Sequence, residues 1–238
     1  WLLIVVTDKK TPKNYKLRNG IVFTTRDQIR FNKKVSELIS WNTSARRSLG
    51  FMLAYKLGAE IIATVDDDNI PKNNWGKNLL LLEKRVVRKY ITNNLAFDPI
   101  SVTNHKHLWH RGYPLQLVSK RSLLKFKNSY IYSDFQADFW NGDPDVDAIE
   151  RMIFKFDCNF NKNLFPFTSN KFSPFNSQNT FISRRALRNF FMFPGIGRME
   201  DIWASYYAQA QGLKVIYGPP SVFQKRNFHD YTIDFKNE

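Results

Sequence analysis

The stretch NTSARRSLGFMLAYKLGAEIIATVDDDNIP, residues 42–71, decides the fold class of this chain. Its first half carries Leu49, Met52 and Leu53 at helical spacing. Gly58 follows where a helix C-terminal cap belongs. We therefore expect a helix over residues 44–57.

The second half of this stretch has the pattern of a buried strand that ends in acids. Residues 60–65 are apolar and β-branched, which is typical of a central strand, and Asp66, Asp67 and Asp68 follow at once. Pro71 is expected to open another helix, which runs to about residue 87. This order predicts an α/β fold with a doubly wound, mostly parallel sheet, in which ligands bind beyond the carboxyl ends of the strands.

The rest of the chain adds further expected elements around this unit. The chain opens within an apolar run and without a methionine, so we expect an upstream segment, with the first strand of the sheet, to be missing. Strands are expected over residues 1–7, 20–24, 179–183, 213–217 and 222–229. Helices are expected over 184–191 and 200–211, a strand or hairpin over 108–118, and loops over 132–147 and 161–176.

Composition narrows the class of protein. The 238 residues fit one domain with a substantial core. The net charge of +15 would attract polyanions, but the cations are scattered pairs, which is more typical of a solvated surface than of a nucleic-acid stripe. The longest apolar runs fall far short of the ~20 residues that span a bilayer, and the single cysteine excludes an internal disulfide. We expect a cytoplasmic protein and leave a peripheral membrane contact open.

The three aspartates need a chemical explanation. Adjacent carboxylates repel one another, and a bound hard cation removes that repulsion. In an extended segment Asp66 and Asp68 point to one side and Asp67 to the other. The sequence therefore predicts Mg²⁺ or Mn²⁺ on Asp66 and Asp68. The alternative is an exposed acidic turn that caps the next helix.

A second acidic pair opens the helix expected from residue 200. Asp201, or Glu200 in second place, follows the glycine-rich turn 195–197 and could act as a general base toward an acceptor hydroxyl. The alternative is ordinary helix capping.

An aromatic ring with nearby carboxylates forms a third candidate. Trp140 and Asp138 lie in an Asp-rich segment, and an aromatic ring beside carboxylates suits a sugar. The alternative is a solvated acidic loop around a core tryptophan.

Residues 42–71 resemble the glycosyltransferase pattern in which an Arg-rich helix start and a glycine precede a strand that ends in Asp-x-Asp. The resemblance implies the GT-A fold, with a DXD metal on Asp66 and Asp68 that bridges the diphosphate of the donor. It places Arg46, Arg47 and Asp67 at the nucleotide-sugar, and a late histidine, His229, as a further metal ligand. A helix N-terminus with added guanidinium charge also favours an anion. A solvated helix face is the alternative for the two arginines, and a surface position for His229.

A closer resemblance rests on several motifs in order. Arg111-Gly-Tyr-Pro and the later Gly195-Ile-Gly-Arg block resemble the reversibly glycosylated polypeptides, the UDP-arabinopyranose mutase family. This resemblance implies a UDP-sugar donor and places Arg111 near the donor sugar. One domain would then comprise a nucleotide-binding half, about residues 1–100, and an acceptor and catalytic half, about 101–238.

Together these features predict metal-dependent transfer of a sugar from a nucleotide-sugar, with UDP as the expected nucleotide, to an unidentified sugar, lipid or protein acceptor. A UDP-sugar pyranose/furanose mutase is the first alternative. A basic nucleic-acid-binding protein is the second, which the scattered charge disfavours, so no nucleic-acid partner is expected.

Overall fold

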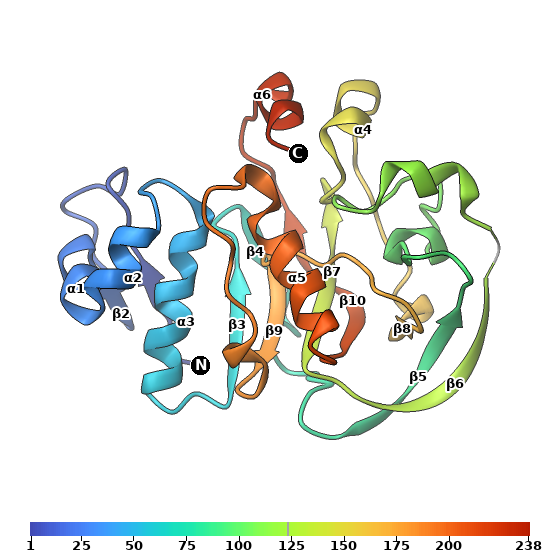
Figure 1. The fold of residues 1–238 in the computed structure, drawn as a ribbon, viewed down its shortest axis with the longest axis horizontal. Coiled ribbons are helices and arrows are strands. Elements are labelled where there is room, and N and C mark those ends of the chain that lie inside the picture. Colours follow the sequence, from blue (N-terminus) through green and yellow to red (C-terminus); the bar gives the residue numbers. More distant parts are fainter. Residues whose placement is uncertain (123) are drawn as a thin grey trace.

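A large mixed sheet forms the centre of the molecule in the computed structural model, which describes residues 1–122 and 124–238 (Figure 1). Over these residues the sheet has eight strands, in the order β3-β9-β7-β10-β8-β5-β6, with β4 paired to β10. The strands are β3 (Ile61–Val65), β4 (Asn69–Pro71), β5 (Lys84–Ile91), β6 (Lys125–Tyr132), β7 (Phe135–Gly142), β8 (Phe167–Ser169), β9 (Asn179–Ser183) and β10 (Val215–Gln224).

The pairing directions bring several strand ends to one edge. β7 pairs in parallel with β10, and β5 with β8, whereas the other pairings of this sheet are antiparallel. Val65 lies opposite Asn179, and Gly142 opposite Gln224. The ends of β3, β7 and β10 and the start of β9 therefore meet at the upper edge of the sheet in Figure 1. The segment Asp66–Asp68, called the acidic turn below, lies at this edge, as the sequence predicts.

A smaller unit lies beside β3. The strands β1 (Ile4–Val6) and β2 (Ile21–Phe23) pair in parallel, and β1 packs on α3. At Gly50 an added Cβ would lie 2.5 Å from Val6 Cγ2, so the helix approaches the strand closely because this position has no side chain. The helices of the chain are α1 (Thr25–Phe31), α2 (Lys33–Leu38), α3 (Arg47–Lys56), α4 (Ala148–Ile153), α5 (Glu200–Ala210) and α6 (Tyr231–Lys236).

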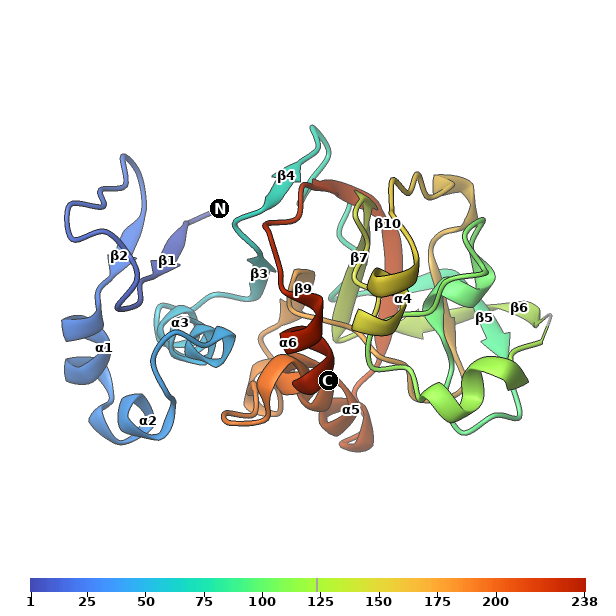
Figure 2. The ribbon, with the colours of Figure 1, turned by 90° about the horizontal axis from the view of Figure 1, so that it is seen from above.

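The core lies between the large sheet and α5, which covers one face of the sheet in both views (Figures 1 and 2). Ala204 and Ala208 of α5 are fully buried there. Phe135 at the start of β7 packs against Phe175 and Phe190, with ring centroids 4.9 and 5.3 Å apart. The buried alanines place α5 against the core, and with it the acidic residues at the start of the helix.

Several sequence predictions of secondary structure are wrong. The expected strand or hairpin 108–118 consists of turns and the start of a 3₁₀ helix, Leu115–Lys120, and the expected helix 184–191 is only a 3₁₀ turn, Ala186–Arg188. Residues 71–87 form no helix: they contain the end of β4, a series of turns, and the start of β5. The expected loop 132–147 contains β7, a central strand that is buried along nearly its whole length. Gln136 and Asp138 interrupt the apolar pattern of β7. The strand can still be buried, because the polar groups of these two residues form hydrogen bonds inside the fold.

Other predictions match closely. The expected helix 44–57 is a 3₁₀ turn, Ser44–Arg46, followed by α3, and the expected helix 200–211 is α5. The two late strands are one strand, β10, with an irregularity between Gly218 and Val222. Within residues 1–122 and 124–238, no helix combines the length and the apolar character needed to cross a membrane.

Candidate functional site

The acidic turn is joined to the start of α3 by an ion pair. Arg47 Nη2 lies 2.5 Å from Asp66 Oδ1, and about a quarter to a third of each side chain stays exposed. Apart from this guanidinium, Asp66 Oδ1 meets no hydrogen-bond donor among the described residues. Burial alone would lower the pKa of Arg47, but the carboxylate of Asp66, aided by Asp201 and Asp67, raises it.

Asp68 faces the segment that leaves β10. Its carboxylate accepts hydrogen bonds from Gln224 Nε2 at 3.1 Å and from the backbone N–H of Asn227 at 3.3 Å. Burial raises the pKa of Asp68, and the nearby charges of Asp66 and Asp67 add to the rise. Asp67 is exposed. The charges of Asp66 and Asp67 thus disfavour ionisation of Asp68, and a cation would relieve that repulsion.

An open hollow of about 270 Å³ is lined in part by Arg47. It is formed by the end of β1, the loop before α3 and the start of that helix. Asp8 holds the loop by accepting a hydrogen bond from the N–H of Asn42, whose φ of 60° is left-handed. The lining residues are Val6, Asp8, Lys10, Asn42, Thr43, Ser44, Arg46 and Arg47. Arg47 thus belongs to both the hollow and the acidic turn.

Asp201 reaches the same arginine through one serine. Asp201 Oδ2 accepts hydrogen bonds from the N–H and the hydroxyl of Ser177, at 2.8 and 3.1 Å. The carbonyl and hydroxyl oxygens of Ser177 accept hydrogen bonds from Arg47 Nη1, at 3.1 and 3.0 Å. The structure therefore brings together the acidic turn and the start of α5, which are 135 residues apart in the sequence.

Arg111 forms a buried charge network with two aspartates. Its Nη2 lies 2.9 Å from Asp145 Oδ2 and 3.3 Å from Asp201 Oδ1, and all three side chains are at most 10% exposed. Burial opposes the charge of Arg111, but the two carboxylates raise its pKa above the ordinary value. Burial likewise opposes the charge of Asp145, and Arg111 with Arg226 holds the pKa of Asp145 well below its usual range.

This network changes the roles expected for Arg111 and Asp201. Asp201 is 7% exposed and accepts hydrogen bonds from Ser177, Ile202 and Arg111. A general base needs a lone pair within reach of the acceptor hydroxyl, so this engaged position suits a positioning residue. Arg111 is 6% exposed and holds Asp201, in place of the expected contact with a donor sugar.

Glu200 binds the loop before α3 through hydrogen bonds. Its carboxylate accepts hydrogen bonds from the hydroxyls of Thr43 and Ser44 and from the N–H of Ala45, at 2.7–3.0 Å. Its 4% exposure leaves no room for an acceptor. The expected second-choice base therefore ties α5 to the wall of the hollow.

Two other expected contacts, those of Trp140 and Asp138, are corrected by burial, and Arg46 lines the hollow but does not reach the acidic turn. Arg46 is 2% exposed, stacks on Trp41 and donates hydrogen bonds to Gln28 and to Ser36, so its guanidinium points away from the acidic turn. Trp140 is 3% exposed, between Phe139 and His110, and offers no ring face to a sugar.

Asp138 lies inside the sheet and accepts a hydrogen bond from Gln136 Nε2 at 2.8 Å. Burial raises its pKa to about 7. An interior carboxyl of this kind does not reach the edge where a sugar would bind.

His229 is not grouped with the aspartates of the turn. Its Nδ1 lies 3.2 Å from Asp234 Oδ2 of α6. Among the residues that the structure describes, no three His, Cys, Asp or Glu side chains converge as a metal site. A cation on Asp66 and Asp68 would therefore take its remaining ligands from water or from a substrate.

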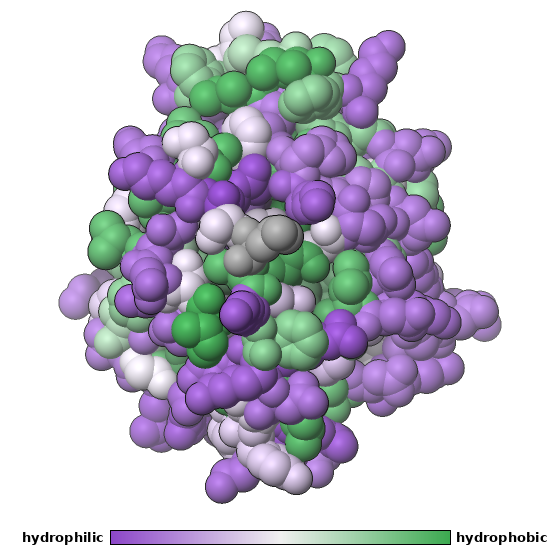
Figure 3. Space-filling view, turned by 90° about the vertical axis from the view of Figure 1, so that its right-hand side faces the viewer, coloured by the Kyte–Doolittle hydropathy of each residue, from purple (hydrophilic) through white to green (hydrophobic). Residues whose placement is uncertain are grey.

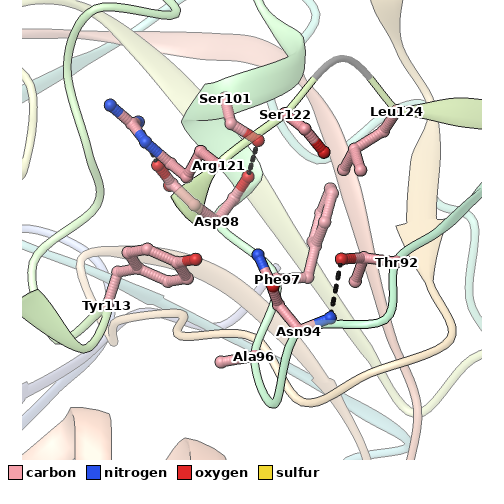
Figure 4. A pocket seen from close by; sticks show the side chains of 10 residues that line it. All are labelled: Thr92, Asn94, Ala96, Phe97, Asp98, Ser101, Tyr113, Arg121, Ser122 and Leu124. Atoms are coloured by element: carbon pink, nitrogen blue, oxygen red, sulfur yellow. Dashed lines mark hydrogen bonds and ion pairs between the residues drawn. The ribbon is translucent and has the colours of Figure 1, made fainter. Parts of the chain in front are cut away.

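A second cavity is much smaller. It encloses about 10 Å³, which is close to the space of one water molecule. Asp98 pairs there with Arg121 at 2.6 Å (Figure 4), and burial raises the pKa of Asp98 to about 6. This cavity is too small for a sugar or a nucleotide.

Several residues of the site were not predicted. Asp8 ends an apolar strand in the way that Asp66 does, so the same signal could have found it. Ser177 and Asn176 lie in the expected loop 161–176 or just after it, and no motif distinguishes them. Asn176 Nδ2 donates to Asp145 Oδ2 at 2.7 Å, a contact between distant segments that composition does not reveal.

Comparison with known proteins gives a distant relationship. No family model matches the chain. Two proteins of Arabidopsis thaliana are similar to it. The probable glycosyltransferase STELLO2 is 22% identical over 249 residues, with 93% of this chain and 32% of the relative covered. For the probable glycosyltransferase STELLO1 the identity is 22% over 231 residues, with 88% and 30% covered.

The chain thus spans about a third of the length of these relatives. The similarities support a glycosyltransferase family for the chain, and its mixed α/β architecture with one large sheet is compatible with a glycosyltransferase fold.

Proposed function

We propose that this chain is a GT-A-type glycosyltransferase domain that binds a nucleotide-sugar, with UDP as the nucleotide, across the hollow and the acidic turn. The nucleoside would occupy the hollow beside Asp8 and Lys10. The diphosphate would lie between the start of α3 and Asp66, where helix N–H groups and a guanidinium favour an anion. The distant similarity to two probable glycosyltransferases supports this reading.

The observation that carries the proposal is the double position of Arg47. This residue lines the hollow and pairs with Asp66 at 2.5 Å. A ligand that extends from the hollow toward the acidic turn must pass its guanidinium. A diphosphate has the charge to replace Asp66 as the partner of Arg47, which would release Asp66 for another ligand.

The residues of the turn fit a divalent cation. Asp66 Oδ1 meets no donor among the described residues besides the guanidinium of Arg47, and Asp68 is held by neutral donors from Gln224 and Asn227. Carboxylate oxygens are the ligands that Mg²⁺ and Mn²⁺ prefer. We propose that Asp66 and Asp68 would hold the cation, which would stabilise the negative charge of the departing nucleoside diphosphate.

Other residues of the network would position this machinery. Asp201 fixes Ser177, and Ser177 fixes the guanidinium of Arg47. Glu200 holds the loop that forms one wall of the hollow. Their proposed role is to keep the binding groups in place before the substrate arrives, which lowers the cost of binding.

The test is release of UDP from a panel of UDP-sugars in the presence of Mn²⁺, with and without candidate acceptors. We expect release by the natural chain and a loss of at least about 100-fold in Asp66→Asn with Asp68→Asn, since each removes a cation ligand. Asp157→Asn, an exposed acid with no ion pair among the described residues, is the matched control.

Two outcomes would reject the transferase. Release that is unchanged in the double variant would contradict the proposed site. Conversion of a UDP-pyranose to a UDP-furanose without UDP release would instead identify the mutase activity.

A further inference from the structure

The strands β5 and β6 carry an unusual concentration of positive charge. Their sequences, KRVVRKYI and KFKNSYIY, contain no acidic residue. The six cations are Lys84, Arg85, Arg88, Lys89, Lys125 and Lys127. The two strands form the end of the large sheet that lies farthest from β1 and α3 (Figure 1).

Stability does not explain this arrangement. Lys89 lies directly opposite Lys127 in the antiparallel pair, and like charges in that position destabilise a sheet. Within the described residues, neither lysine forms an ion pair. Lysines on an edge strand can protect it against pairing with another sheet, which would explain Lys127 on β6. β5 lies between β8 and β6, so edge protection does not explain Lys89.

Exposed aliphatic side chains accompany these lysines. Lys89 and Ile91 of β5 share one face of the ribbon with their partners Lys125 and Lys127. The opposite face is turned to the core here, because Tyr90 packs on Phe97 and Phe167. Ile91 on the outward face is 40% exposed.

The loop after β5 extends the same surface. Leu95 is 82% exposed, and the neighbouring Asn94 donates a hydrogen bond from Nδ2 to the carbonyl of Lys120 at 3.1 Å. We call Lys89, Ile91, Leu95, Lys120, Lys125 and Lys127 the ribbon end. Figure 3 shows this side of the molecule, where hydrophobic residues lie among many hydrophilic ones.

We propose that the ribbon end docks on an anionic membrane surface. Lysines near a bilayer are attracted by acidic headgroups, and exposed aliphatic groups gain free energy at the boundary of the acyl chains. Single-stranded nucleic acid would need exposed rings beside the lysines for stacking. The exposed rings of β6, Phe126 and Tyr130, alternate with Lys125 and Lys127 along the strand and therefore lie on its other face. A second copy of the chain would bring like charges together. This inference does not depend on the proposed nucleotide site, whose hollow lies beside β1 and α3, away from β5 and β6 (Figure 1).

The test is sedimentation of the chain with vesicles of phosphatidylcholine alone, and with 30% phosphatidylserine added, as a function of salt. We expect binding to the anionic vesicles that weakens as salt rises. Lys89→Gln with Lys125→Gln and Lys127→Gln should lower the partition coefficient by about 100-fold, from roughly fivefold per charge. Leu95→Ser should lower it by roughly tenfold.

A matched control removes the same charge elsewhere. Lys13→Gln with Lys16→Gln and Lys34→Gln changes three exposed lysines near β1 and α2 and should leave vesicle binding within about threefold of the natural chain. Equal losses in the two triple variants would overturn the proposal, since net charge alone would then explain binding. Absence of vesicle binding would overturn it too, as would retention of a single-stranded RNA by the ribbon end instead.

Discussion

Removal of the Arg111 guanidinium should destabilise the fold strongly. In Arg111→Met, Asp145 and Asp201 keep their buried positions but lose the cation at 2.9 and 3.3 Å. Breaking a buried pair on one side costs about 3–5 kcal/mol, because an uncompensated charge is left inside. For a domain of this size that corresponds to a fall in melting temperature of roughly 6–20 °C.

Urea unfolding followed by tryptophan fluorescence measures this loss. Arg188→Met is the matched control, since Arg188 is exposed and donates to the hydroxyl of Tyr55; it should change the free energy of unfolding by less than about 0.5 kcal/mol. Adding Asp145→Asn to Arg111→Met should recover part of the loss, because one buried charge disappears. If Arg111→Met unfolds at the same urea concentration as the natural chain, the buried network does not exist as described.

Three further changes test other parts of the structure. Glu200→Ala should cost about 3 kcal/mol in thermal unfolding, because hydrogen-bond donors of the loop 43–45 lose their acceptor; an unchanged melting temperature would contradict this. Asp138→Asn should flatten the pH dependence of urea unfolding. Burial raises the pKa of Asp138 to about 7, whereas the unfolded chain ionises it near 4. The free energy of unfolding of the natural chain therefore falls as the pH rises from about 4 to about 7; an equal dependence on pH in the variant would refute the assignment. Gly112→Ala should destabilise more than Gly58→Ala in urea unfolding. Both have positive φ, but only at Gly112 does the new Cβ meet a side chain, at 2.3 Å; equal losses would contradict the contact.

Local patterns predicted the elements around the acidic turn. The apolar run before Asp66 and the helical spacing up to Gly58 depend on neighbouring residues, so β3 and α3 match their expected ranges. The meeting of the acidic turn with the start of α5 does not follow from strand order, since β9, the strand before α5, runs antiparallel to β3 and begins at that edge.

The errors arise where distant contacts decide the outcome. β7 contains Gln136 and Asp138, which suggest a loop until their partners in the folded sheet are known. Arg46 and Arg47 are adjacent and chemically equal in the sequence. In the folded chain, contacts with Trp41 and Gln28 turn Arg46 inward, whereas Arg47 pairs with Asp66.

The central claim is that the hollow and the acidic turn form one donor site around Arg47. Calorimetric titration with UDP, with and without Mn²⁺, tests it most directly. We predict that Mn²⁺ strengthens UDP binding by at least about tenfold, or 1.4 kcal/mol, and that Asp66→Asn with Asp68→Asn abolishes this gain. UDP binding of equal strength with and without Mn²⁺, unchanged by the two substitutions, would contradict the account.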